Sequence, residues 1–320
     1  MSLKFGVTLP QFTQDRDRFL SGARRAEQLG YDSAWVFDHL WPLSGGRERP
    51  VLESWMAMAY LATATERIGI GTLVTRSSLR HPVVLAKMVA TVGEAAPGRV
   101  VCAVGSGDKL SRAENVAFGI AYFEDEDRIS QLASTVEILT AYTGEEVVNQ
   151  SDGFLHVENL ATSPRPDPAP RIWVGGGARS ALHLAGEGAN GWNRWGTELE
   201  RFERAARTVS AAAGERPIEI SWAGQVMVAE SDDEAQAKLA GRGAGSTGPQ
   251  SKSGAGSGGP QAKRDPGQFV AGGPATVAAQ LDGFIRAGAT HLIAAFPDAG
   301  DPGSYELFAE SVIPLLRGGG

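Results

Sequence analysis

The sequence contains a single cysteine, Cys102, among its 320 residues. An intrachain disulfide is therefore impossible, and a reducing compartment fits best. The chain also has no apolar run near 18 residues, and the segment from Met1 to Phe5 carries no secretory hydrophobic region. We therefore expect a cytoplasmic protein without a membrane span.

The signatures of several enzyme classes are also missing. The histidines are His39, His81, His156, His183 and His291. No two of them have metal-ligand spacing, so no metal site is expected. A Gly-x-Ser-x-Gly elbow and a P-loop are both absent. A dinucleotide fingerprint begins at Gly105 but fails at Leu110, where its third glycine should stand.

Positive charge is scarce relative to negative charge. The chain has 30 Lys and Arg against 37 Asp and Glu, a net charge of −7. This balance argues against nucleic acid or an anionic membrane as the main partner. We expect a small-molecule substrate instead.

Short apolar segments alternate with helical patterns along almost the whole chain, a pattern typical of a parallel α/β sheet. The eight predicted strands cover residues 3–9, 33–37, 68–74, 100–105, 171–174, 191–195, 218–228 and 291–296. A closed barrel and an open doubly wound sheet both satisfy this alternation. The count of eight and the missing dinucleotide fingerprint favour a (β/α)8 TIM barrel, formed as one domain over residues 1–320.

Two segments interrupt the alternation. Residues 108–127 follow the fourth strand and are too long for an ordinary loop, so we expect them to line or cover an active site. Residues 241–264 hold eight glycines, four cationic residues and no acidic or aromatic residue. Such a composition cannot form a core and predicts a flexible loop. The alternative is a lid whose Lys252, Lys263 and Arg264 meet an anionic ligand.

In a TIM barrel the active site lies at the C-terminal ends of the strands. The second predicted strand ends in Asp38, His39 and Trp41. Histidine titrates near neutral pH and can pass a proton to a reacting group. One Asp-His pair is also common as a purely structural feature, but its place at a strand end favours a catalytic role.

Glycines gather at two further strand ends. Gly175, Gly176 and Gly177 precede a predicted helix that begins near Arg179. Free N–H groups and the helix dipole favour an anion there, so we predict a phosphate site; a tight turn alone would explain one or two glycines. Ser106 and Gly107, after the fourth strand, predict close approach of the backbone to a flat ring or a phosphate.

These strand ends together resemble the luciferase-like monooxygenase family, and more narrowly its branch that uses the deazaflavin coenzyme F420. The matching segments, in chain order, are residues 30–39, 67–74, 97–107 and 172–177. The resemblance runs from residue 3 to residue 316. It implies a (β/α)8 barrel with an insertion, normally a homodimer.

The resemblance also implies roles for individual residues. His39 matches a histidine near the reactive face of the deazaflavin, and Asp108 matches a glutamate that can act as an acid. Trp41 stands for a tryptophan that follows the histidine. The resemblance further implies a cofactor site built from Asp38, Thr72, Leu73, Val74, Ser106, Gly107, Gly175, Gly176, Gly177 and Arg179. In it, Leu73 and Val74 are joined by a non-prolyl cis peptide that forms a bulge.

Three functions follow from this resemblance. The first is an F420-dependent oxidoreductase that exchanges a hydride with an alcohol, carbonyl or activated alkene while His39 handles the proton. The second is an FMN-dependent monooxygenase served by a separate flavin reductase. The third is a flavin-binding relative without turnover, against which the intact His39, Asp108 and glycine turn argue.

Overall fold

Eight parallel strands close into a barrel, as predicted. The computed structural model describes residues 2–43, 46–108, 111–244, 269–297 and 302–318. The barrel strands, in order, are β1 (Lys4–Thr8), β2 (Ser33–Val36), β3 (Gly69–Arg76), β4 (Val100–Gly105), β7 (Arg171–Gly175), β8 (Gly191–Trp195), β9 (Glu219–Val228) and β11 (His291–Ala295). Parallel pairing of β11 with both β9 and β1 closes the ring.

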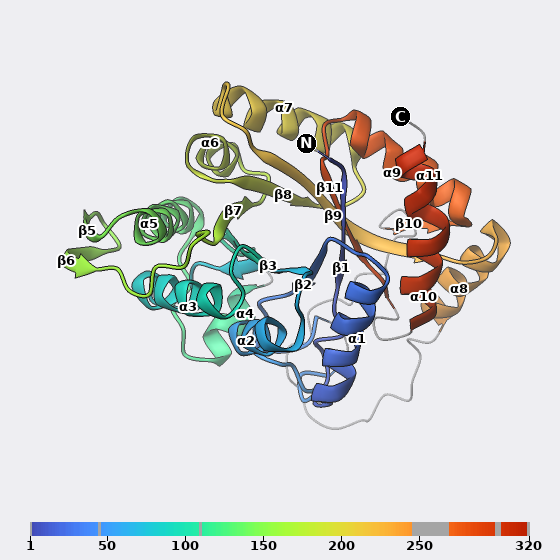
Figure 1. Cartoon of the computed structure of the whole chain (residues 1–320), viewed down its shortest axis with the longest axis horizontal. Coiled ribbons are helices and arrows are strands. Elements are labelled where there is room, and N and C mark those ends of the chain that lie inside the picture. Colours follow the sequence, from blue (N-terminus) through green and yellow to red (C-terminus); the bar gives the residue numbers. More distant parts are fainter. Residues whose placement is uncertain (1, 44–45, 109–110, 245–268, 298–301, 319–320) are drawn as a thin grey trace.

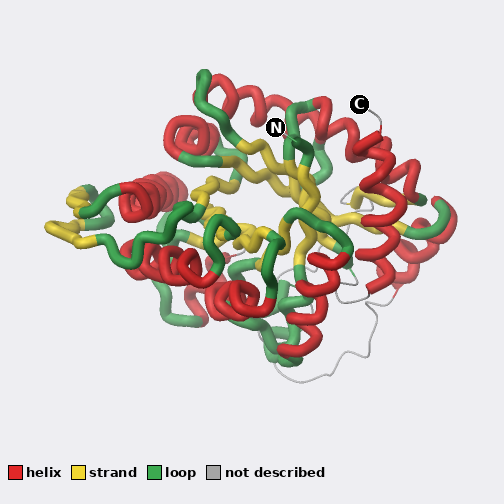
Figure 2. The backbone as a smooth tube through the Cα atoms, viewed as in Figure 1, coloured by secondary structure: helices red, strands yellow, loops and turns green. Residues whose placement is uncertain are grey.

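Helices surround the strands and shield them from solvent (Figure 1, Figure 2). They are α1 (Arg16–Gln28), α2 (Ser54–Ala64), α3 (Pro82–Ala95), α4 (Ser111–Ala117), α5 (Asp125–Gly144), α6 (Arg179–Gly188), α7 (Leu199–Ala213), α8 (Asp232–Ala244), α9 (Pro274–Arg286), α10 (Pro302–Leu307) and α11 (Ile313–Gly318), the last two joined by a π-helical turn (Phe308–Val312). Their ends follow local chemistry. Asp15 caps α1 by accepting a hydrogen bond from the Arg18 N–H at 3.0 Å, and Gly30 follows the helix with φ +78°.

Several elements were not among the sequence predictions. They are α4, α5, α8, the antiparallel hairpin of β5 (Val147–Ser151) and β6 (His156–Ala161), and β10 (Phe269–Gly272), which pairs with β9. The buried Leu132, Val136 and Leu139 of α5 recur at helical spacing, a usable signal. Of the predicted loop 241–264, residues 241–244 end α8, and residues 245–264 lie outside the described residues.

Large and small residues alternate in the barrel interior. Trp35 and Trp173 are fully buried there, with ring centroids 5.2 Å apart. A Cβ on Gly71 would lie 2.4 Å from the Trp35 ring, and one on Gly191 would lie 2.6 Å from Trp173. These glycines therefore leave the volume that two indoles fill, and the barrel is a packed core.

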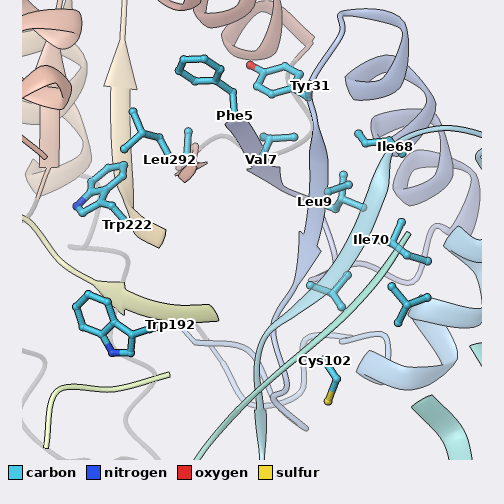
Figure 3. Packing of buried hydrophobic residues seen from close by; sticks show 14 of the residues in the cluster. Phe5, Val7, Leu9, Tyr31, Ile68, Ile70, Cys102, Trp192, Trp222 and Leu292 are labelled. Carbon is cyan, nitrogen blue, oxygen red and sulfur yellow. The ribbon is translucent and has the colours of Figure 1, made fainter. Parts of the chain in front are cut away.

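The outward faces of the strands carry the main hydrophobic core against the helices (Figure 3). Along β4, Val100, Cys102 and Val104 belong to this core, while Val101 and Ala103 belong to the barrel interior. Cys102 is fully buried, and burial raises the pKa of its thiol. This thiol is part of the packing and is not an activated nucleophile.

A buried polar network lies at the N-terminal ends of the strands. Glu219 is 2.7 Å from Nδ1 of His291, whose Nε2 is 2.7 Å from the Ser33 hydroxyl. Lys4 and Arg171 complete the network, 3.1 and 2.6 Å from Glu219. The arrangement is like that of a serine hydrolase, but it lies at the barrel end that serves stability.

Candidate active site

A buried carboxylate holds His39 at the C-terminal ends of the strands. Nδ1 of His39 lies 3.0 Å from Oε2 of Glu114, whose side chain is 1% exposed. His39 follows β2, whereas Glu114 belongs to α4, within the segment 108–127. The other Glu114 oxygen accepts hydrogen bonds from the backbone N–H groups of Leu40 and Trp41. Glu114 therefore orients both the imidazole ring and the backbone that follows it.

The ionisation of Glu114 determines which nitrogen of His39 is available. Burial raises the pKa of Glu114, but hydrogen bonds from His39 and Leu40 and the charge of Arg76, 3.0 Å away, lower it below its usual value. An ionised carboxylate only accepts hydrogen bonds. Nδ1 of His39 thus carries a hydrogen, and Nε2 is the nitrogen left to exchange a proton with another molecule.

Asp38 points to a different set of partners. Its two carboxylate oxygens lie 2.7 and 2.9 Å from the guanidinium of Arg80, and it also accepts from the Ser54 hydroxyl and the Arg76 backbone N–H. Burial raises the pKa of Asp38, but these bonds, chiefly from Arg80, lower it overall. Asp38 thus ties the end of β2 to α2 and to the segment after β3.

Trp41 follows β2, and Asp108 lies between β4 and α4. The Trp41 ring contacts Phe118 edge-on at 6.4 Å between centroids, and the Arg47 guanidinium lies over its face. The Asp108 carboxylate accepts from the N–H and hydroxyl of Ser111 at 2.9 Å and so caps α4. The acid that contacts His39 is therefore Glu114, six residues further along.

The predicted cis peptide is present between Leu73 and Val74. The register of β3 against β4 shifts between Thr72 and Thr75, which forms the predicted bulge. A Cβ on Gly105 would lie 2.8 Å from the Val74 side chain, and one on Gly175 would lie 2.7 Å from it. Two glycines on neighbouring strands therefore leave space for Val74. Thr72 is buried, and its hydroxyl donates to the Ala103 carbonyl.

The two glycine turns have left-handed backbone at one residue each. Gly107 has φ +73°, and its carbonyl accepts from Arg128 at 3.0 Å, next to the partly buried Ser106. Gly176 has φ +125°, and its carbonyl accepts from the Trp192 indole at 2.8 Å. Only glycine adopts such conformations readily.

The turn of residues 175–177 leads into α6, which begins at Arg179 without a side-chain cap. A Cβ on Gly177 would lie 1.9 Å from the Arg194 guanidinium. The turn thus combines a helix N-terminus, backbone without side chains and an adjacent cation, which suits a phosphate.

Comparison with known proteins agrees with this geometry. The family model for luciferase-like monooxygenases matches residues 3–291. The chain belongs to the luciferase-like monooxygenase family. The family predicted from the strand ends is therefore confirmed.

Individual relatives are similar to this luciferase-like chain over nearly its whole length. An F420-dependent glucose-6-phosphate dehydrogenase of Kineococcus radiotolerans is 27% identical, over 92% of this chain and 91% of the relative. The solved structure of an F420-dependent secondary alcohol dehydrogenase with an F420–acetone adduct has a TM-score of 0.79 at 20% identity, covering 99% of this chain and 100% of the other. The monooxygenase RslO1 of Streptomyces bottropensis has a TM-score of 0.76 at 20% identity, covering 98% and 99%. The two solved structures confirm the fold.

Sequence reasoning missed three charged residues of the luciferase-like site. Glu114, Arg76 and Arg194 come from α4, β3 and β8. No spacing in the sequence connects Glu114 with His39, 75 residues away. Its position inside the long segment after the fourth strand was the available signal.

Two further searches cover only the part of the chain that the structure describes. Within it, no group of three or more His, Cys, Asp or Glu side chains could hold a metal ion. No helix in those ranges combines the length and apolar character needed to cross a bilayer.

Proposed function

We propose that this chain is an F420-dependent oxidoreductase that exchanges a hydride between the deazaflavin and a small organic alcohol, carbonyl or activated alkene. The observation that carries the proposal is the contact of His39 with Glu114, which also contacts Arg76 at the end of β3, because it supplies an oriented proton carrier at the barrel end. The F420-dependent dehydrogenases among the relatives support the choice of coenzyme.

The residues present fit such a coenzyme. Gly175, Gly176 and Gly177 form a turn that side chains would fill, ahead of the free N-terminus of α6, and they would hold the coenzyme phosphate with Arg179 and Arg194 nearby. Ser106 and Gly107 would approach the coenzyme from β4. The bulge at Val74 would support the ring, which supplies or accepts the hydride when bound.

In this proposal His39 moves the proton. For an alcohol substrate, Nε2 of His39 would take the O–H proton. For a carbonyl substrate, the same nitrogen would donate a proton to the carbonyl oxygen. Glu114 holds the ring and stabilises the imidazolium that forms, since its carboxylate lies 3.0 Å from Nδ1. Asp38 would not contact the substrate. It would fix the end of the strand that His39 follows.

Aromatic side chains would form the substrate wall. Phe12 stacks on Phe37 at 6.0 Å between centroids, and Phe37 meets Trp195 edge-on at 5.8 Å. Trp195, at the end of β8, is 44% exposed. Together with Trp41, these rings would exclude water from the reacting atoms.

A second candidate is an FMN-dependent monooxygenase served by a separate reductase. The fold similarity to the monooxygenase RslO1 favours it, since the barrel is common to both chemistries. We place it second because the glucose-6-phosphate dehydrogenase of Kineococcus radiotolerans, which matches over 92% of this chain, is F420-dependent.

We further propose a cytoplasmic homodimer. Met56 and Tyr60 on α2 and Val84 on α3 are exposed apolar side chains on neighbouring helices. They give a second copy an apolar surface to bury. Light scattering on the purified protein measures the mass directly.

Titration of the purified protein with F420 and with FMN, each followed by fluorescence, tests the choice of coenzyme. We expect saturable binding of F420 at lower concentration than FMN. Tight binding of FMN alone would favour the monooxygenase instead. Binding of neither would favour a relative without turnover.

A further inference from the structure

A hollow lined by arginines lies next to the glycine turn. It has a volume of about 250 Å³ and is lined by Gly177, Leu182, Arg194, Arg201, Arg204, Ala205 and Thr208. The lining holds three arginines and no acidic residue. We call this hollow the arginine groove. It lies between α6 and α7, which contact each other and lie close to β8 in the upper part of Figure 1.

Helix packing explains why the groove exists. A Cβ on Gly186 would lie 2.4 Å from the Ala212 side chain, so the two helices touch near their C-terminal ends. Nearer the glycine turn, Leu182 in the first half of α6 and Arg201 in the first turn of α7 line the groove. The groove therefore opens at the end of the helices where the glycine turn lies.

Arg194 is the innermost cation of the groove. It is half-buried and has no hydrogen bond or ion pair with any described residue, and its guanidinium packs on Gly177. Burial lowers the pKa of Arg194, and Arg201 and Arg204 lower it further against the opposing charge of Glu198. Three cations in one hollow repel one another, so an anionic ligand would stabilise their arrangement.

The ion pairs of the two outer arginines, Arg201 and Arg204, are weak. Arg201 lies 2.9 Å from Glu198 and Arg204 lies 3.7 Å from Glu200, and all four side chains are more than half exposed. Exposed pairs of this kind contribute little and exchange readily. Arg201 and Arg204 can therefore turn toward a ligand without losing a strong bond.

We propose that the arginine groove binds the carboxylates of the oligoglutamate tail that F420 carries beyond its phosphate. The inference rests on the proposed function, which sets the phosphate at residues 175–177. The groove adjoins that turn: its first cation packs on Gly177, and its outer cations, Arg201 and Arg204, follow along α7, where the glutamate carboxylates would bind. Arg194 would bind near the phosphate, and Arg201 and Arg204 would bind the carboxylates of the tail.

Direct binding of two forms of the coenzyme tests this assignment. One form carries several glutamates, and the other ends before the first glutamate. Fluorescence titration of both forms is carried out with the native protein and with the double variant Arg201→Gln/Arg204→Gln. We expect the native protein to bind the tailed form about 5- to 20-fold more tightly at low salt. The double variant should bring this ratio to about 1 without changing the affinity for the tailless form.

A matched control removes two arginines away from the groove. Arg207→Gln/Arg286→Gln changes the net charge equally, at exposed residues that pair with Glu203 and Asp282. It should keep the native ratio. An unchanged ratio in Arg201→Gln/Arg204→Gln would overturn the proposal, as would an equal loss of affinity for both forms, which would assign the groove to the phosphate. Binding of neither form by the native protein would instead contradict the proposed function itself.

Discussion

Oε2 of Glu114 and Nδ1 of His39 lie 3.0 Å apart, although 75 residues separate them in the sequence. The contact joins a loop after β2 to a short helix after β4. It fixes the orientation of the His39 ring and holds the hydrogen on Nδ1. The fold therefore determines that Nε2 is the nitrogen that exchanges a proton.

Glu114→Gln should lower turnover about 10- to 100-fold, because the amide no longer stabilises a charged imidazole ring. The affinity for the coenzyme and KM should change by less than about threefold. Steady-state kinetics measure both, and ¹⁵N NMR of the histidine ring reports a change in the protonation pattern of His39. Glu203→Gln, on exposed α7, is the control. An unaltered NMR signature and turnover would show that Glu114 does not act through His39.

Arg80→Met should destabilise the protein by about 3–5 kcal/mol, because it leaves the carboxylate of Asp38 buried without its cation. Adding Asp38→Asn to the same chain should recover part of that loss. Urea unfolding measures both variants. A recovery of zero would mean that Arg80 stabilises the fold through Glu53 and not through Asp38.

Gly105→Ala should destabilise the protein by about 1–3 kcal/mol, since the new methyl would lie 2.8 Å from the Val74 side chain. Val74→Ala in the same chain removes the clash, so the double variant should be more stable than Gly105→Ala alone. Thermal or urea unfolding provides the comparison. Equal stability of the single and double variants would contradict the packing described for the bulge.

Stability should fall in acid through the network at the N-terminal strand ends. Burial raises the pKa of Glu219, but His291, Arg171 and Lys4 lower it to about 2. A carboxylate whose pKa is lower in the folded than in the unfolded chain stabilises the fold at pH values above its unfolded pKa, near 4.5. This stabilisation is lost as the pH falls toward 2. Burial also lowers the pKa of His291, so protonating it begins to cost stability below about pH 6.5.

Urea midpoints measured from pH 7 to pH 2.5 test this dependence. The native protein should lose more of its stability across this range than Glu219→Gln, which has no carboxylate to protonate. Parallel curves for the two proteins would show that Glu219 does not contribute to the acid sensitivity.

The barrel could be predicted because each strand carries its own signal. Segments such as residues 100–105 are apolar throughout, and parallel strands covered on both faces require that pattern. The hairpin of β5 and β6 has only Val148 and Gln150 buried along β5, so its residues resemble a polar loop. Its position depends on packing against α5, which a local pattern does not reveal.

The parts of the site that depend on local backbone conformation could be predicted from the sequence. The parts that depend on contacts between residues far apart in the sequence could not. Gly176 and the peptide between Leu73 and Val74 belong to local segments that resemble a family. The choice of Glu114 over Asp38 or Asp108 as the partner of His39 depends on how the segment 108–127 folds over the barrel. The Asp108 carboxylate caps α4 by accepting from the Ser111 N–H, and the Asp38 carboxylate accepts from the Arg80 guanidinium.

Turnover by His39→Ala with saturating F420 tests the central claim most directly. The measurement uses a substrate that supports coenzyme reduction by the native protein, and fluorescence confirms that the variant still binds F420. We predict a loss of about 10²–10⁴-fold in kcat with coenzyme affinity within about threefold of the native value. Undiminished turnover by His39→Ala would contradict the account.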